Sequence, residues 1–166
     1  MIQKIREVAL IFRERYGRNL ATGFLGELYA CKVLGLELAE NPIQKGYDAA
    51  KDGKKYQIKT RCSIKGSKVN LRGRIGKFRD SDFDYALLVL LDDKYNLKEI
   101  WQAEAKNEKL KTAIKKDQTK NSGMHIKTFI DIAQKFFPNQ RQKNERLMSL
   151  RRKFNFAEDM PDFSEK

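Results

Sequence analysis

The sequence predicts an α/β domain in which helices cover a mixed β-sheet. Apolar residues recur at helical spacing near the N-terminus. An Asp-Gly pair at 52–53 separates two β-prone runs, and the run YALLVLL at 85–91 is short and uniformly apolar, as buried strands are. The chain of 166 residues is 40% hydrophobic and 34% charged, which is typical of a globular domain with a full core.

Two helices are expected first. The first ends near Gly17, and the second runs from Thr22, as its N-terminal cap, to Gly35, which stops it. The apolar face of the first helix is formed by Ile2, Ile5, Ala9, Phe12 and Tyr16. One side of the second helix is lined by Phe24, Leu28, Cys31 and Leu34.

The strands come next. Asp52-Gly53 favours a two-residue hairpin turn. Residues 85–91 predict a buried strand, after which Asp92, Asp93 and Asn96 mark a turn and residues 97–103 return as another strand.

Helices are expected to complete the core. Residues 104–114 predict one helix, and Phe129, Ile132, Ala133 and Phe136 predict another that ends at Pro138. We therefore expect a single domain over residues 1–138. The charged extension over 139–166 is either a helix that packs on the body or on a partner, or a partly mobile segment.

The net charge predicts a polyanionic partner. Thirty-five Lys and Arg against 22 Asp and Glu give +13, and binding to phosphates releases counterions. A basic protein that is merely soluble is the alternative, but no acidic residue lies between Gly53 and Arg79, whereas a solvated face intersperses both signs. The cations expected to contact a nucleic-acid backbone are Arg61, Lys65, Lys68, Arg72, Arg74, Lys77 and Arg79.

Several classes of protein are excluded. No apolar run approaches the ~20 residues that span a membrane, and the N-terminus does not resemble a secretory signal, so we expect a cytoplasmic protein. His125 is the only histidine, which excludes histidine-rich zinc sites and His-based triads elsewhere. Cys31 and Cys62 are far apart in sequence and are expected to be free thiols.

The hairpin turn brings polar residues together. If Asp52 and Gly53 are the central residues, Asp48 faces Gln57, and Lys59 shares their face because side chains alternate. Directly opposed Cβ atoms lie roughly 4.5–5.5 Å apart. A carboxylate, an amide and an ammonium then converge, which suits phosphodiester cleavage with a hard dication. The alternative is an exposed polar hairpin face without a function.

The segment GYDAAKDGKKYQIKTR resembles the PD-(D/E)XK nuclease superfamily, whose fold is called restriction-endonuclease-like. In that family an Asp on one strand and an acid-x-Lys on the next strand bind metal and activate water. Matched to this motif, Asp48 takes the Asp position, Gln57 the second acidic position and Lys59 the lysine. The resemblance also implies that Glu27, in GFLGELYACKVLG, is a further ligand from the preceding helix. Gln57 departs from the usual acid.

Glu27 has independent support from its helical neighbours. The residues three and four positions away are mostly apolar, and a carboxylate on such a stripe needs a partner because burying it alone is costly. A metal ion or a salt bridge to a lysine or arginine would each satisfy it.

The resemblance implies a metal-dependent DNA endonuclease of the restriction or repair type. Mg²⁺ or Mn²⁺ would be held by Asp48, Glu27 and Gln57, and Lys59 would assist the attacking water. Two cuts on a duplex suggest a homodimer by family analogy. Three alternatives stay open: a catalytically inactive DNA-binding protein of the same fold, a structure-specific nuclease that resembles Holliday-junction resolvases, and a basic domain that binds only protein.

Overall fold

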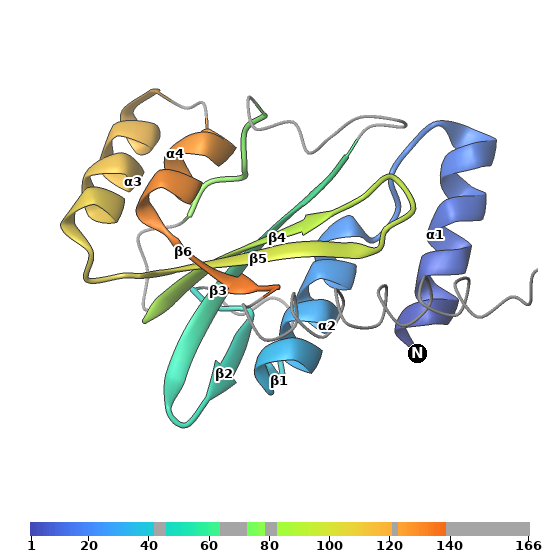
Figure 1. Ribbon diagram of the computed structural model, residues 1–166, viewed down its shortest axis with the longest axis horizontal. Helices are drawn as coiled ribbons and strands as arrows, with labels where there is room; N and C mark the ends of the chain where they lie inside the picture. The colour runs from blue at the N-terminus through green and yellow to red at the C-terminus, as the bar shows by residue number, and fades with distance from the viewer. Residues whose placement is uncertain (42–45, 64–72, 79–82, 121–122, 139–166) are drawn as a thin grey trace, which may run out of the picture.

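The computed structural model is built on one six-stranded mixed β-sheet with helices on both faces (Figure 1). The structure describes residues 1–41, 46–63, 73–78, 83–120 and 123–138. The strand order is β1-β2-β3-β4-β5-β6; β3 and β4 are parallel, and the other neighbours are antiparallel. The α/β class predicted from the sequence is confirmed. The extension expected over 139–166 lies outside the described residues.

The elements follow one another as α1 (Ile2–Tyr16), α2 (Thr22–Leu34), β1 (Glu37–Leu38), β2 (Ala49–Lys51), β3 (Lys54–Cys62), β4 (Tyr85–Leu91), β5 (Leu97–Glu104), α3 (Glu108–Lys120), α4 (Ile126–Ile132) and β6 (Gln134–Phe137). In Figure 1, α3 and α4 lie together at one end of the drawing and α1 lies at the other, with the sheet between them. Among the described helices, none combines the length and the apolar character of a membrane span.

The ends of α1 and α2 are those expected. Each helix is followed by a glycine in the left-handed conformation, Gly17 with φ 65° and Gly35 with φ 68°. Their backbone N–H groups donate to the carbonyls of Arg13 and Cys31, which closes the last turn of each helix.

The start and the buried face of α2 differ from the prediction. The cap residue is Ala21, and Thr22 is the first helical residue, with no capping hydrogen bond from a side chain. Phe24 is 44% exposed, because the helix turns a neighbouring face toward the sheet. That face is formed by Leu25, Gly26, Ala30 and Leu34.

The hydrophobic core lies on both faces of the sheet. β4 is the central element, and its alternate side chains enter the two core clusters: Leu87 and Val89 lie on the side of α1 and α2, and Leu88 and Leu90 on the side of α3 and α4. All four are fully buried, so the predicted buried strand is confirmed.

The chain after β5 departs from the prediction. A helix does follow β5, but it begins at Glu108, where the Asn107 side chain accepts a hydrogen bond from the backbone N of Lys109 (3.0 Å). The prediction of a helix that ends at Pro138 is wrong. Instead, α4 ends at Ile132, and β6 follows it and pairs with the edge of β5. The apolar spacing fitted a helix, but this antiparallel pairing satisfies backbone groups of both strands.

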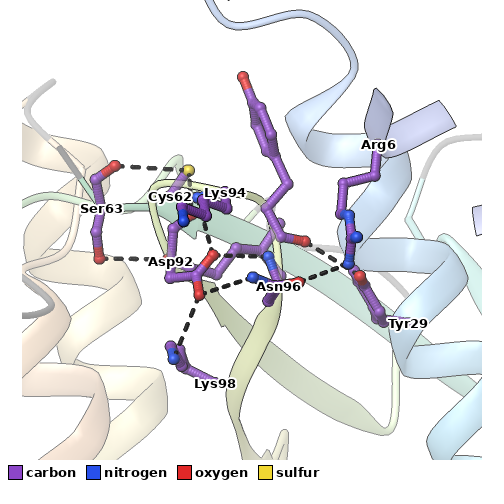
Figure 2. A network of polar contacts seen from close by, with 10 residues as sticks. Arg6, Tyr29, Cys62, Ser63, Asp92, Lys94, Asn96 and Lys98 are labelled. Carbon is purple, nitrogen blue, oxygen red and sulfur yellow. Dashed lines mark hydrogen bonds and ion pairs between the residues drawn. The ribbon is translucent and has the colours of Figure 1, made fainter. Parts of the chain in front are cut away.

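A polar cluster at the β4–β5 turn joins the sheet to α1 (Figure 2). The Asp92 carboxylate accepts hydrogen bonds from the backbone N of Lys94 (2.9 Å) and of Asn96 (2.8 Å) and from the Asn96 side-chain amide (3.0 Å). It also forms an ion pair with Lys98 at 3.3 Å. Arg6 of α1 donates to the Asn96 side-chain oxygen. The predicted turn is therefore confirmed.

Candidate functional site

The β2–β3 hairpin has the predicted two-residue turn. Lys51 pairs with Lys54, and the two central residues are both left-handed, Asp52 with φ 50° and Gly53 with φ 72°. Two consecutive left-handed residues are typical of the tight turns that join antiparallel strands. Because the turn has two residues, the pairs next to it, from Lys51 with Lys54 to Ala49 with Tyr56, have the register derived from the sequence; the regular pairing ends there, before the predicted pair of Asp48 and Gln57.

Asp48 lies directly before β2, beyond the last paired residue of that strand. Its backbone N donates to the carbonyl of Tyr56 (2.8 Å), and its Oδ2 accepts from the backbone N of Ile58 (2.6 Å). Asp48 is thus bonded on either side of Gln57, to Tyr56 through its backbone N and to Ile58 through its carboxylate, which takes the place of a backbone acceptor in the ladder. Among the described residues, no donor bonds to the second oxygen, Oδ1.

Gln57 is buried, with 4% of its surface exposed, and its side chain is the most enclosed polar group of the site. The side-chain oxygen Oε1 is buried and finds no hydrogen-bond donor among the described residues. An unsatisfied buried acceptor costs about 1–3 kcal/mol, so native proteins rarely retain one without a reason. This oxygen is a candidate ligand atom.

Glu27 reaches the site because α2 packs unusually close to β3. A Cβ atom on Gly26 would lie 1.8 Å from Oγ1 of Thr60, so only glycine permits this approach. Thr60 Oγ1 also donates to the carbonyl of Gly23 (3.5 Å). The next residue after Gly26 is Glu27, which is brought within electrostatic range of Asp48 and Lys59.

The surroundings of Glu27 raise the pKa of its carboxyl group. Partial burial raises the pKa of Glu27, the nearby Asp48 carboxylate raises it further, and Lys59 lowers it by less. Among the described residues, none forms an ion pair or a hydrogen bond with the Glu27 carboxylate, so the salt-bridge alternative has no support there. One turn later, burial and then the Glu27 charge raise the pKa of the Cys31 thiol to about 11.

The Lys59 side chain extends from β3 toward the segment 73–78. Its stem passes Gly76, where an added Cβ would lie 3.8 Å from Lys59 Cδ, and its Nζ lies 6.0 Å from the centroid of the Phe78 ring. No ion pair joins the Lys59 ammonium to another described residue. The ammonium is therefore not engaged in a structural salt bridge with this part of the chain.

Three of the predicted phosphate-binding cations fall in the described residues. Arg61 and Arg74 are exposed and Lys77 is half-buried. The Arg61 guanidinium donates to the Arg74 carbonyl, and Arg74 Nη1 donates to the carbonyl of Gly123 (3.0 Å), so both arginines also fasten the segment 73–78. The other predicted cations lie outside the described residues: Lys65, Lys68, Arg72 and Arg79.

The donor set fits a hard dication. Glu27 and Asp48 offer carboxylate oxygens and Gln57 offers an amide oxygen, the ligand type that Mg²⁺ accepts together with water and phosphate. In the described part of the chain, no group of three or more His, Cys, Asp and Glu side chains could hold a metal. The site therefore has two acids, as Gln57 implies.

The sequence did not reveal the neighbours that shape this site. Neither Gly26 nor Phe78 was among the site residues expected from the sequence. A small residue directly before a candidate ligand on a helix is a signal of close packing that the sequence does contain. The contact of Phe78 with Lys59 has no comparable signal.

Comparison with known proteins does not place the chain in a family. No family model matches it, and no curated protein matches it.

Proposed function

We propose that this protein is a metal-dependent nuclease of the restriction-endonuclease-like class that hydrolyses phosphodiester bonds in DNA. The observation that supports this best is the buried Gln57 Oε1, which has no donor among the described residues and belongs to the residue next to Ile58, whose backbone N bonds to Asp48. The raised pKa of Glu27 agrees, because burial and the neighbouring Asp48 carboxylate both oppose its ionisation. A dication would satisfy the amide oxygen and stabilise both carboxylates.

Each residue has a distinct part in this proposal. Glu27, Asp48 and Gln57 would hold Mg²⁺ or Mn²⁺, which when bound polarises a phosphoryl oxygen and lowers the pKa of a bound water. The backbone hydrogen bond from Ile58 orients the Asp48 carboxylate before the ligand arrives. The Lys59 ammonium would orient the attacking water or neutralise charge that develops on the phosphate.

The DNA backbone would be held by basic residues near Lys59. Lys77 follows Gly76, which lies beside the Lys59 stem, and the net charge of the chain is +13. Such cations position phosphates and do not by themselves select a sequence. A homodimer would place two sites on one duplex, by analogy with restriction endonucleases.

A catalytically inactive DNA-binding protein of the same fold is the second candidate. It is favoured by one observation, the amide of Gln57 at the position where the resemblance expects an acid. Two carboxylates would hold a dication more weakly than three, because affinity rises with ligand charge.

Cleavage of supercoiled plasmid with Mg²⁺, with and without a chelator, tests the proposal. Asp48→Ala and Lys59→Ala should each lower the rate by at least about 10²-fold while DNA affinity and fold persist. Asp52→Asn is a matched control for Asp48, because it removes an exposed carboxylate from the tip of the same hairpin at a left-handed residue that Asn tolerates. Lys109→Ala, on an exposed position of α3, is the control for Lys59.

The outcomes separate the candidates. Full activity of either site variant would contradict the site. A wild-type protein that binds DNA but does not cut it at any Mg²⁺ concentration would favour the inactive DNA-binding protein. A wild-type protein that shows no salt-sensitive binding to DNA would favour a domain that binds only protein.

A further inference from the structure

The proposed role of Lys59 requires contacts that hold its side chain in one conformation. A lysine side chain loses about 2 kcal/mol of rotamer entropy when it is held in one conformation. Most ordered lysines are held by a carboxylate, but no described residue forms an ion pair with Lys59. The groups that lie against it belong to the segment 73–78: Gly76 beside the stem and the Phe78 ring near the ammonium, with Nζ 6.0 Å from the ring centroid.

Phe78 is fixed by its surroundings. It is 2% exposed and stacks on Phe129 of α4, with ring centroids 5.4 Å apart and planes at 17°. Its segment is bonded to the start of α4, because Ile75 N donates to Met124 O (2.8 Å) and Ile126 N donates to Gly73 O (2.9 Å). The position of the Phe78 ring is therefore fixed by its packing, and the Lys59 side chain takes the conformation that brings its ammonium to the ring.

We propose that Phe78 is a positioning residue that holds the Lys59 ammonium at the site, a role that rests on the proposed nuclease function. The face of an aromatic ring attracts a cation through its quadrupole. Unlike a carboxylate, the ring accepts no directed hydrogen bond. The ammonium can therefore still bind an anion such as a phosphate. The N–H groups that point away from the ring stay available for a water or a phosphate oxygen.

The placement is tested first without any activity measurement. In protein labelled with ¹³C-lysine, ring current should shift the Hε protons of Lys59 upfield, and Lys59→Arg identifies their signal by its loss. The shift should disappear in Phe78→Leu and persist in Phe83→Leu. Phe83 is the matched control, since its ring packs against Phe78 at 6.2 Å but no contact with Lys59 is recorded for it. Hε signals at random-coil positions in the wild type would overturn the proposal.

The consequence for catalysis is tested by kinetics. Phe78→Leu should lower kcat by about tenfold and leave KM for DNA nearly unchanged, because the ammonium acts on the reacting groups. In the Lys59→Ala background the same substitution should have no further effect. Equal effects of Phe78→Leu in both backgrounds would show that the ring stabilises only the core, and would overturn the proposal.

If Phe78→Leu destabilises the fold, fluorinated phenylalanines at position 78 test the attraction between the ring and the ammonium instead. One, two and three fluorines weaken the attraction of the ring for a cation with little change in shape, so kcat should fall stepwise with fluorine number. A constant kcat along the series would overturn the proposal. If the wild type cuts no DNA, the nuclease function fails, and the lysine spectra alone decide whether Phe78 holds Lys59.

Discussion

Two polar clusters on the same sheet differ in how completely their acids are paired, although Arg6 Nε of the first cluster is also a buried atom without a partner among the described residues. At the β4–β5 turn, both oxygens of Asp92 accept hydrogen bonds, from two backbone N–H groups and from the Asn96 amide, and Lys98 adds an ion pair. At the start of β2, Asp48 has one bonded oxygen, and neither the Glu27 carboxylate nor Gln57 Oε1 has a partner among the described residues.

The pKa values of the acids record the same contrast. Burial of Asp92 opposes its ionisation, but hydrogen bonds from the side chain and backbone of Asn96 and from the backbone of Lys94 outweigh it, so its pKa is lowered. Burial of Glu27 also opposes ionisation, no hydrogen bond compensates, and its pKa is raised. The first cluster stabilises the fold, whereas the second has unfavourable electrostatics that a bound cation would relieve.

Removal of Asp92 should have the largest effect on stability. Asp92→Ala leaves its donors without an acceptor, and we expect a loss of about 2–4 kcal/mol in the free energy of unfolding. Cleavage per folded molecule should persist. Urea denaturation followed by Trp101 fluorescence measures the loss, and Asp52→Asn, at the exposed tip of the β2–β3 hairpin, is the control.

The pH dependence of this loss has a defined sign. Because the pKa of Asp92 is lowered in the folded protein, its stabilisation is present above the unfolded value near 3.8 and is lost as pH falls through the folded value. Wild type and Asp92→Ala should therefore converge in stability at pH well below 3.8. A difference that persists unchanged there would mean that Asp92 acts through packing.

The contact of α2 with β3 gives the next largest effect. Gly26→Ala places a methyl group on Thr60 and should lower stability by about 1–3 kcal/mol. Gly23→Ala lies three residues earlier on α2, where an added Cβ meets nothing within 4 Å, and it should leave stability unchanged or slightly higher. Equal melting temperatures for the two variants would contradict the close approach that brings Glu27 to the site.

Glu27→Gln should have the smallest effect, and its direction is informative. Because the pKa of Glu27 is raised in the folded protein, its ionised form disfavours folding above the unfolded value of 4.5. Without metal at pH 7 the variant should therefore melt slightly higher than wild type, and the difference should vanish as pH falls below 4.5. A variant that melts lower at pH 7 would indicate a structural salt bridge instead.

The sequence was sufficient for features that depend on local geometry. A two-residue Asp52-Gly53 turn determines which residues of β2 and β3 are neighbours, so the pairing from Lys51 with Lys54 to Ala49 with Tyr56 followed from the turn. Gly17 and Gly35 marked helix ends because glycine adopts the left-handed conformation readily.

Features that depend on contacts between distant segments could not be predicted. β6 exists because residues 134–137 pair with the free edge of β5, although their spacing also fits a helix. The position of Phe78 depends on its stacking with Phe129, about fifty residues later in the chain. The hydrogen bond from Ile58 N to the Asp48 side chain is local to the hairpin, but it departs from the regular ladder that the turn alone predicts.

Titration of ¹⁵N-labelled protein with Mn²⁺ tests the central claim, that Glu27, Asp48 and Gln57 hold a dication, without requiring cleavage. In the wild type, paramagnetic broadening should appear first at the amide signals of these residues and of Ile58. Gln57→Leu should need at least about tenfold more Mn²⁺ for the same broadening, and Gln57→Glu should need less, because a carboxylate adds charge to the site. Broadening that begins around Asp92, or that is identical in wild type and Gln57→Leu, would contradict the account.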